Sequence, residues 1–265
     1  MSNPKLSIVD THAHLDMKEF AGDRDEVITR ALAAGVTRII TVGTDITSSQ
    51  QAIALAGKYP QVYAAVGVHP HDAGRVESSY LARLAELAKA PKVVAIGETG
   101  LDFYRNYSPK EAQFNILRGQ LELAAELNLP IIIHARQAAL EMIETLSDWV
   151  KRHKDTSGRP RGVIHCFSDD AQTARKYLNL GFYISFAGYV SYPQSRAPAV
   201  AKTISIDRIL VETDCPFLTP QKHRGKRNEP SYVVLTAEVV ARAVGMSFEK
   251  FAEQTTENAQ RLFKL

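Results

Sequence analysis

The sequence predicts an α/β protein in which eight parallel strands, each followed by a helix or a helix-bearing loop, close into a (β/α)8 barrel with an extra C-terminal helix. Strand-like and helix-like segments alternate along the whole chain, which indicates a parallel sheet. Eight such units close into a barrel, and 265 residues is a typical length for one. No linker, low-complexity tract or shift in composition divides the chain, so residues 1–265 are expected to form one barrel domain.

The eight predicted strands are short apolar or β-branched runs between turn signals. They are expected at residues 8–16, 37–42, 61–68, 92–97, 131–133, 162–164, 182–186 and 208–211. An open, doubly wound sheet is the competing architecture, but it would usually carry a glycine-rich phosphate loop after the first strand. That place holds Thr11-His12-Ala13-His14 instead, which favours the barrel.

The predicted helices fill the intervals between the strands. They cover residues 24–34, 48–58, 80–88, 109–128, 138–153, a segment that ends at 180, 198–203, and two final segments that begin near 232 and 247. Gly35 suits a left-handed cap at the end of the first helix. The long fourth helix has the clearest start, because Ser108 is a candidate N-cap, Pro109 suits the first helical position and Glu111 completes a capping box.

Composition and charge are those of an ordinary soluble enzyme with a sizeable core, since 45% of the residues are hydrophobic and 23% are charged. A formal charge of +3 and a pI near 8.8 permit a nucleic-acid partner without arguing for one. The N-terminus lacks a signal-peptide pattern, and no apolar run has the length of a transmembrane helix. Two cysteines form no disulfide framework. We therefore expect a cytoplasmic protein with no membrane association, and the sequence indicates no protein partner.

The first strand carries two histidines, His12 and His14. Because side chains alternate between the two faces of a strand, both imidazoles lie on one side while Ala13 points away. Two imidazoles one strand step apart can close on one metal ion, although buried histidines are often held by hydrogen bonds alone. The ends of four later strands favour the metal hypothesis.

Imidazole and carboxylate groups also stand at the ends of those later strands. The C-terminal strand ends of a barrel converge on one face, where active sites lie. That face is expected to carry His69 and six candidate ligands for a pair of divalent cations: His12, His14, Glu98, His134, His165 and Asp214. Each alone could be a capped or core-satisfied polar residue, but together they would crowd one barrel mouth without compensation unless cations paired them. Glu98, on a middle strand, is the candidate bridge between the two cations.

Five strand-end motifs and a C-terminal motif follow one another along the chain: VDTHAHLD from Val9, GVHPH from Gly67, GETGLD from Gly97, HCF from His165, VETD from Val211 and TTENAQRLF from Thr255. In this order they resemble the TatD family of metal-dependent DNases over essentially the whole chain. The resemblance implies an amidohydrolase-type TIM barrel and metal-dependent hydrolysis of nucleic-acid phosphodiesters, with 3′-to-5′ exonuclease activity. It also places the family's metal positions on the same six residues. Glu98 stands where other amidohydrolases often carry a carboxylated lysine, which argues against a dihydroorotase-like or phosphotriesterase-like enzyme.

The candidate catalytic residues follow from the chemistry of such a site. Two cations could activate a water, neutralise the phosphate and stabilise the leaving oxygen of an in-line displacement. Asp214, as a ligand at an open position, is the expected acceptor of the water's proton. Glu212, on the same strand face, could orient a ligand or the water, or pair with a cation of the barrel. His69 is a candidate donor to a phosphate oxygen, with a hydrogen-bonded histidine before Pro70 as the alternative.

The metal itself stays open among zinc, manganese and magnesium. Histidine-rich ligation tolerates zinc or manganese, whereas magnesium prefers oxygen ligands. Cys166 and Cys215 each follow a proposed ligand directly, so a strand-like backbone would aim both thiols away from the metals.

Loops on the same face are expected to bind the substrate. The segment 221–228 after the last strand holds four basic residues and a histidine around a glycine, and His223, Arg224 and Lys226 are its candidate phosphate contacts. A solvated charged loop is the alternative. Arg136, one strand step beyond His134, could add a second phosphate contact. Aromatic residues in these loops suit the stacking of unpaired bases: Phe103, Tyr104, Tyr107, Phe167, Tyr189, Tyr192 and Phe217.

Three functions compete at this point. The first is a deoxyribonuclease that trims single-stranded DNA ends, or RNA, in DNA repair or fragment turnover. The second is a deacylase that removes D-amino acids from tRNA with the same metals, which the ligand set alone does not separate from the first. The third is a metal-stabilised barrel that binds nucleic acid or protein without catalysis, and the complete ligand set disfavours it.

Overall fold

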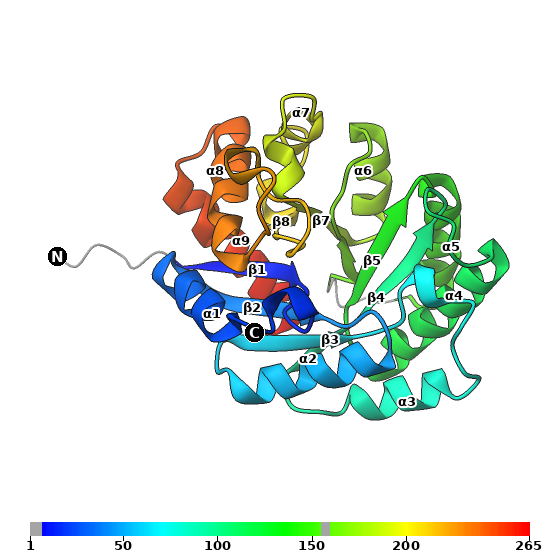
Figure 1. The fold of residues 1–265 in the computed structure, drawn as a ribbon. Helices are drawn as coiled ribbons and strands as arrows, with labels where there is room; N and C mark the ends of the chain where they lie inside the picture. The colour runs from blue at the N-terminus through cyan, green and yellow to red at the C-terminus, as the bar shows by residue number, and fades with distance from the viewer. Residues whose placement is uncertain (1–6, 155–159) are drawn as a thin grey trace.

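The computed structural model describes residues 7–154 and 160–265 and shows the predicted α/β barrel (Figure 1). Eight strands form one sheet in chain order, and each neighbouring pair is parallel. They are β1 (Ile8–Ala13), β2 (Val36–Val42), β3 (Val62–Val66), β4 (Val93–Asp102), β5 (Ile131–Arg136), β6 (Gly162–Ile164), β7 (Phe182–Phe186) and β8 (Ile209–Val211). An isolated parallel bridge between Ala13 and Cys215 joins the two ends of the sheet.

Helices follow the strands and surround the sheet (Figure 1). The α-helices are α1 (Arg24–Ala33), α2 (Ile46–Lys58), α3 (Tyr80–Leu87), α4 (Lys110–Leu127), α5 (Ala139–Arg152), α6 (Ala171–Asn179), α7 (Ala197–Ala201), α8 (Val233–Val244) and α9 (Phe248–Phe263). Short 3-10 helices lie at Lys18–Phe20, Pro70–Asp72, Gly188–Ser191, Ile206–Arg208, Gln221–His223 and Pro230–Tyr232. Gly35 has the predicted left-handed conformation after α1, with a φ of 89°. The extra C-terminal helix that the sequence predicts is α9.

The start of α4 differs from the prediction. Pro109 is the N-cap residue and no side chain caps this end, so the predicted capping box is wrong. The Ser108 hydroxyl is taken up by the segment that follows β3 instead: it donates to the carbonyl of His71 and accepts from the N–H of Gly74. Tertiary hydrogen bonds thus replace the local cap.

The fourth strand also extends beyond its predicted range. β4 continues past Glu98 to Asp102, because its last residues pair with the end of β5. Gly100 permits this close approach, since a Cβ there would lie 1.9 Å from the carbonyl oxygen of His134. Polar residues of β4 and β5 are therefore carried together beyond the rest of the sheet.

The barrel interior is apolar, and α9 closes it at the N-terminal end of the strands. Every strand contributes inward side chains, and α9 adds three that pack against them: Ala259, Leu262 and Phe263. Thr256 of α9 donates to the carbonyl of Ser7 beside β1, and Asn258 donates to the carbonyl of Ile209 in β8. These bonds fix α9 across the starts of the strands. Outward side chains of the strands form a second, larger core with the helices.

Within residues 7–154 and 160–265, no single helix is both long and apolar enough to cross a bilayer. The pair Pro230–Val244 and Phe248–Phe263 meets the length and composition only jointly, across a bend of 107°.

Candidate metal centre at the C-terminal end of the barrel

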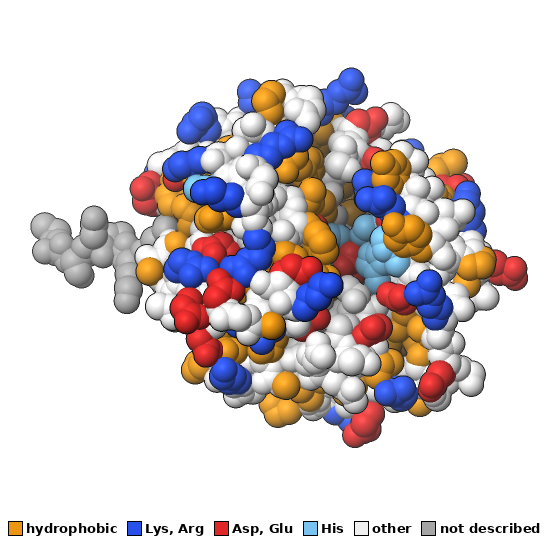
Figure 2. Space-filling view, in the orientation of Figure 1, with side chains coloured by type: hydrophobic (Ala, Val, Ile, Leu, Met, Phe, Trp, Pro, Cys, Tyr) orange, Lys and Arg blue, Asp and Glu red, His pale blue; other side chains and the backbone are white. Residues whose placement is uncertain are grey.

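A cavity of about 650 Å³ opens where the strands end. Histidine and acidic side chains gather in the hollow of this face (Figure 2). The lining includes most of the predicted centre: His14, His69, Glu98, His134, His165 and Asp214. His12 lies fully buried beneath it. The structure therefore brings together all six candidate ligands and His69.

Glu98 occupies the middle of this group. Its Oε1 lies 2.8 Å from Nε2 of His165 and 3.0 Å from Nδ1 of His134. Its Oε2 lies 3.3 Å from Nε2 of His12 and 3.8 Å from Nε2 of His14. Each carboxylate oxygen thus faces a different histidine pair, which is the arrangement that a bridging ligand between two cations requires.

Asp214 completes the histidine pair of β1. Its Oδ1 lies 3.4 Å from Nε2 of His14 and 3.9 Å from Nε2 of His12. The backbone of Asp214 has a φ of 56°, in the left-handed region, and its N–H donates to the carbonyl of His12. Among the described residues, three sets of ligand atoms are close enough to hold an ion: His12, His14 and Asp214; His69, Glu98 and His134; and His12, His165 and Glu212. Imidazole nitrogens with carboxylate oxygens suit zinc or manganese.

Both carboxylates of the centre favour their ionised forms. Burial alone would raise the pKa of Glu98, but the nearby charges of His165, His69 and His12 outweigh it and hold this pKa well below its ordinary value. Burial also opposes ionisation of Asp214, whose pKa is lowered by the hydrogen bond from His14. Buried carboxylates that stay ionised attract divalent cations, and a proton on His14 would compete with such a cation.

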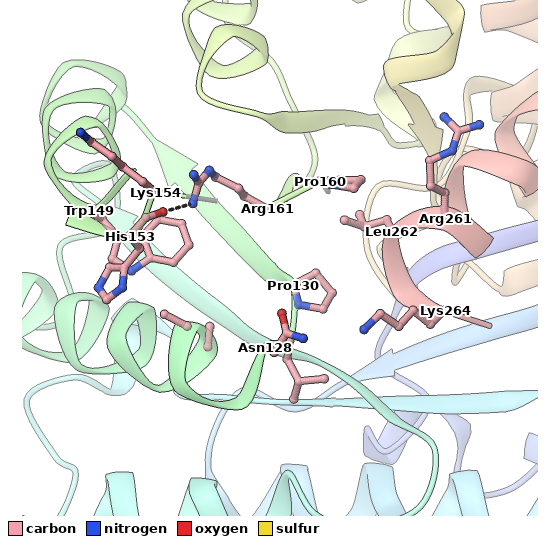
Figure 3. A pocket seen from close by; sticks show the side chains of 13 residues that line it. Asn128, Pro130, Trp149, His153, Lys154, Pro160, Arg161, Arg261, Leu262 and Lys264 are labelled. Atoms are coloured by element: carbon pink, nitrogen blue, oxygen red, sulfur yellow. Dashed lines mark hydrogen bonds between the residues drawn. The ribbon is translucent and has the colours of Figure 1, made fainter. Parts of the chain in front are cut away.

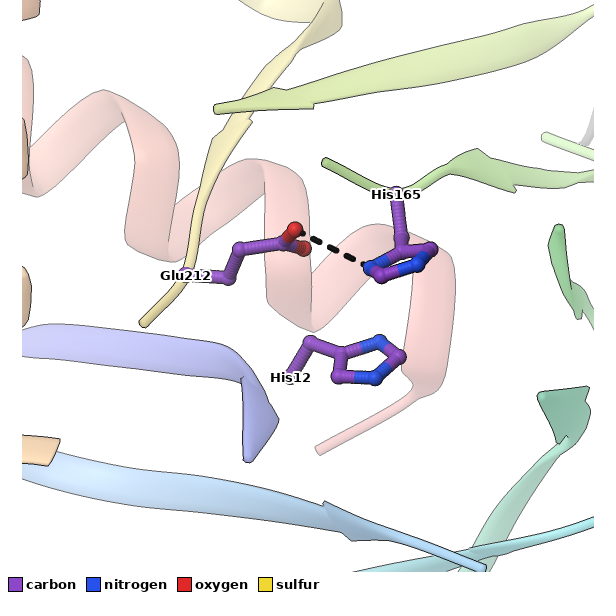
Figure 4. A group of neighbouring side chains, drawn as sticks. All are labelled: His12, His165 and Glu212. Carbon is purple, nitrogen blue, oxygen red and sulfur yellow. Dashed lines mark hydrogen bonds and ion pairs between the residues drawn. The ribbon is translucent and has the colours of Figure 1, made fainter. Parts of the chain in front are cut away.

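The carboxylate of Glu212 lies beside the rings of His165 and His12 (Figure 4). Its Oε1 lies 3.2 Å from Nδ1 of His165 and accepts from the N–H of Cys166 at 2.6 Å. The rings of His165 and His12 are stacked, with centroids 4.1 Å apart. A carboxylate that binds Nδ1 of a histidine turns its Nε2 toward the metal centre. Orienting a ligand in this way is one of the roles that the sequence predicts for Glu212.

Asp102 is a functional candidate that the sequence reasoning missed. Its Oδ2 lies 3.1 Å from Nε2 of His134 and 3.0 Å from Nε2 of His71, and the side chain is fully buried. Burial opposes its ionisation, but the hydrogen bonds from His134 and its neighbours lower the pKa of Asp102. A signal existed: Asp102 is four residues beyond Glu98, so period-two alternation puts both on one strand face once β4 is known to extend that far.

His69 directs one nitrogen at the centre. Its Nδ1 accepts from the N–H of His71, so in the neutral ring the proton lies on Nε2, 3.5 Å from Oε1 of Glu98. Burial lowers the pKa of His69 to about 4, which keeps the ring neutral near pH 7. His69 is therefore both a hydrogen-bonded histidine before Pro70 and a donor that faces the cavity.

Arg136 lines the cavity, and its guanidinium lies 4.0 Å from the ring centroid of Tyr104. Three predicted aromatic residues are exposed near the mouth: Tyr104 at 52%, Tyr107 at 62% and Phe217 at 48%. The ring of Tyr107 lies 4.7 Å from that of His71, and the ring of Phe217 lies 6.2 Å from that of His14. Phe167 is buried in the core and does not face the mouth.

The basic loop after β8 lies outside the cavity lining. His223 stacks on Tyr232 with centroids 4.4 Å apart, and the guanidinium of Arg224 lies 4.7 Å from the Tyr192 centroid. The carbonyl of Lys226 accepts from Thr219. The structure thus does not bring His223, Arg224 and Lys226 to the histidine cluster, and their contact with phosphate stays a prediction.

Cys166 is placed differently from the prediction. Its φ of 47° is left-handed rather than strand-like, and this turn brings the residue into the lining of the cavity. The expectation that its backbone would aim it away is therefore wrong. Burial raises the pKa of its thiol well above the ordinary value, so the thiol stays protonated. Cys215 is fully buried in the core.

Comparison with known proteins shows which family this chain resembles. A family model described as TatD related DNase matches residues 9–264. The uncharacterized metal-dependent hydrolase YabD of Bacillus subtilis is 45% identical over 259 residues, which cover 97% of this chain and 99% of the relative. The 3′-5′ ssDNA/RNA exonuclease TatD of Salmonella typhimurium is 36% identical over 262 residues, which cover 97% of this chain and 98% of the relative.

Solved structures give the same picture. The crystal structure of YJJV, a TatD homolog from Escherichia coli K12, matches with a TM-score of 0.90 and 31% identity, over 97% of this chain and 98% of that one. A hydrolase of the TatD family from Entamoeba histolytica matches with a TM-score of 0.86 and 25% identity, over 98% of this chain and 99% of that one.

Proposed function

The chain belongs to the TatD family of metal-dependent hydrolases, and on this premise we propose that it is an exonuclease that shortens single-stranded DNA or RNA from the 3′ end. The 36%-identical relative from Salmonella typhimurium carries that activity in its name. Trimming of this kind suits a role in DNA repair or in the turnover of nucleic-acid fragments.

The proposal includes two divalent cations, held by His12, His14, Glu98, His134, His165 and Asp214. The observation that carries it is the position of Glu98, whose two oxygens face two different histidine pairs. When bound, such ions supply an activated water and charge stabilisation at the phosphate. Zinc and manganese suit the imidazoles, and magnesium remains a candidate through the carboxylates.

The side chains around the centre have separate tasks in the proposed hydrolysis. Water oxygen bonds to phosphorus while the bond from phosphorus to the 3′-oxygen of the preceding nucleotide breaks. Asp214 accepts the proton that the water loses, and solvent returns a proton to the 3′-oxygen. His69 donates from Nε2 to a phosphate oxygen, and Arg136 pairs with the phosphate charge. Glu212 keeps the His165 ring oriented throughout.

The rim of the cavity supports an unpaired substrate. Tyr104, Tyr107 and Phe217 present exposed rings beside Arg136, His71 and His14, and bases of a single strand can stack on such rings. A base held in a duplex cannot turn its face to them. The loop residues His223, Arg224 and Lys226 are proposed to contact phosphates of the strand outside the cavity.

The test uses 5′-labelled single-stranded DNA and RNA with metal-stripped protein, to which magnesium, manganese or zinc is restored in turn. We expect a ladder that shortens from the 3′ end and disappears with chelator. A Glu98→Ala variant purified in the same way is the control for contaminating nucleases, and it should leave the strand intact. The metal that restores the ladder identifies the working cofactor.

An intact oligonucleotide in all three metals, with folded and metal-loaded protein, would contradict the nuclease proposal. The same ligand set could attack an ester carbon, so D-tyrosyl-tRNA is the next substrate to test. Release of D-tyrosine without cleavage of DNA or RNA would replace the exonuclease by a deacylase.

A further inference from the structure

Two arginines on one side of the cavity have guanidinium groups without a partner. Arg105 follows β4 and Arg136 ends β5, and both are exposed and line the cavity. Within residues 7–154 and 160–265, both bond only through their backbones: the N–H of Arg105 donates to Asp102, and the carbonyl of Arg136 accepts from Phe103. Figure 2 shows Lys or Arg side chains next to the histidines of the hollow.

Arginines elsewhere in the barrel are bound to the protein itself. At the opposite end, the guanidinium of Arg161 lies 5.6 Å from the ring of Trp149 and donates to the carbonyl of His153 at 2.8 Å (Figure 3). Arg227, after β8, donates to Asp23. In both cases the protein supplies the acceptors. The two arginines of the cavity have donors that are available to a ligand.

The ring of Tyr104 lies next to both of these guanidinium groups. Its centroid is 4.0 Å from the guanidinium of Arg136 and 5.5 Å from that of Arg105. Contact with an aromatic ring orients a guanidinium and leaves its N–H groups to bind other acceptors. Tyr104 thus keeps two positive charges near each other, and these charges repel. An anion bound beside them would relieve this repulsion.

The backbone fixes both arginines relative to the metal centre. The N–H of Arg105 donates to Oδ1 of Asp102 at 2.7 Å, and Oδ2 of the same carboxylate lies 3.1 Å from Nε2 of His134. Arg136 is the partner of Asp102 in the pairing of β4 with β5. One buried carboxylate therefore positions both a proposed metal ligand and Arg105.

The two arginines lie at different distances along the chain from the centre. Arg136 is one strand step beyond His134, which suits the phosphate under attack. Arg105 lies past the end of β4, in the loop, and is left for another phosphate. A strand that ends in a 3′-hydroxyl has no phosphate beyond its terminal nucleotide. The only phosphate next to the one under attack is therefore the next one toward the 5′ end.

We propose that Arg105 binds the phosphate one nucleotide upstream of the phosphate under attack, with Arg136 between it and the metal centre. Guanidinium N–H groups bind phosphate oxygens through charge-assisted hydrogen bonds. The inference rests on the proposed exonuclease and specifies its substrate as a single strand with two successive charged linkages at the 3′ end. A dinucleotide with a free 5′-hydroxyl lacks the second anion, so trimming should slow at that length.

The test removes one charge from the substrate. Metal-loaded protein cleaves an oligothymidylate with phosphodiesters throughout, a strand with an uncharged methylphosphonate at the second linkage from the 3′ end, and a strand with the methylphosphonate several linkages further upstream. The first bond to be cleaved is the same in all of them, and chromatography measures the initial release of dTMP. The second strand should react at least about tenfold more slowly than the first, because it loses hydrogen bonds to a charged group. The third should react almost as fast as the first.

Variants assign this effect to Arg105. In Arg105→Gln, the ratio of the rates for the first and second strands should fall to about one. The ratio compares two substrates of one variant, so a general loss of activity cancels. Arg118→Gln is the matched control and should keep the ratio of the parent, because Arg118 is an exposed arginine of α4 that lies 5.4 Å from the ring of Phe114 and outside the cavity.

Two results would overturn the proposal: equal rates for the first and second strands with the parent protein, or a ratio in Arg105→Gln equal to that of the parent. Thermal unfolding checks that the variant folds. If it does not, Arg105→Lys takes its place and should give a ratio between one and that of the parent, because an ammonium cannot form the paired hydrogen bonds of a guanidinium. Failure of the exonuclease itself is distinct, since the first strand would then release no dTMP.

Discussion

The two ends of the barrel are built from the same eight strands and differ in what fills them. At the C-terminal end, buried imidazoles and carboxylates lie within 4 Å of one another around Glu98. At the N-terminal end, Ala259, Leu262 and Phe263 of α9 pack on the apolar interior. The apolar end gains stability from its own burial, whereas the polar end offers a set of ligands that cations would complete. Stability and chemistry therefore reside at opposite ends.

The largest expected effect is at the polar end. Glu98→Gln keeps the shape of the side chain but removes the charge that faces both histidine pairs. Charge stabilisation by two bound cations contributes several kcal/mol to such a reaction, so cleavage should fall by about a thousand-fold or more. Initial rates on labelled single-stranded DNA measure this. A variant that keeps its activity would show that Glu98 does not hold the metals.

The apolar end should respond in stability and not in chemistry. Phe263→Ala empties a position that is 2% exposed in the interior core, and such truncations cost about 3–5 kcal/mol. Urea unfolding measures the loss, and Leu265→Ala, at a partly buried neighbour, is the matched control with a smaller effect. The cleavage rate well below the unfolding temperature should equal that of the parent. A rate loss as large as that of Glu98→Gln would mean that the two ends are coupled.

The polar end could be predicted because simple periodicities locate it. Alternation along β1 puts His12 and His14 on one face, and parallel strands in a barrel collect their C-terminal ends in one place. Those two rules suffice to predict that residues from strands as distant in sequence as β1 and β8 lie in one site. The closure by α9 was not predicted, because a C-terminal helix gives no local sign of which end of a barrel it covers.

Other features depend on tertiary contacts that no local pattern reports. Asp102 was missed because β4 continues only through its pairing with β5, which Gly100 permits. The Ser108 hydroxyl bonds to the segment that follows β3 and does not cap α4. Cys166 lines the cavity because its backbone is left-handed, and its position directly after His165 gives no sign of that conformation.

The missed carboxylate gives the next prediction. Asp102→Asn removes the charge that fixes Nε2 of His134, and loss of such an outer partner typically weakens metal binding by about 10–100-fold. Competition with a metal-binding dye measures this affinity without any substrate. Asp72→Asn, at a half-buried carboxylate on the cavity wall, is the matched control and should bind metal as the parent does. Equal affinities of the Asp102 variant and the parent would make Asp102 a packing residue only.

The aromatic rim should affect substrate affinity more than rate. Base stacking on an aromatic ring is worth about 1–3 kcal/mol, so Tyr104→Ala and Phe217→Ala should each weaken binding of single-stranded DNA by that amount. Anisotropy with labelled DNA is measured in the Glu98→Gln background, which prevents degradation. Leu140→Ala, at an exposed apolar residue of α5 outside the cavity, should change nothing. Equal losses for blunt duplex and single strand would argue against recognition of unpaired bases.

The smallest expected effect concerns the two arginines that tie the segment after β8 to the start of α1. Arg227, after β8, donates to Asp23 with both terminal nitrogens, and Arg30 binds Asp23 and Glu229. The hydrogen bond from Arg227, followed by that from Arg30, lowers the pKa of Asp23 to about 2, although slight burial opposes it. Both arginines are thus paired with acids.

The sign of the resulting pH dependence follows from this lowered pKa. In the unfolded chain Asp23 takes up a proton near its ordinary pKa of 3.8. In the folded chain its pKa is about 2, so it takes up the proton only at a lower pH. The stabilisation is therefore complete above pH 3.8 and is lost as the pH falls toward 2. Because Asp23 is partly exposed, the pair contributes at most about 1 kcal/mol. Urea unfolding of the parent and of Asp23→Asn should differ at pH 6 and converge as the pH is lowered through this window. A difference that is constant with pH would mean that packing, rather than charge, ties this loop to the barrel.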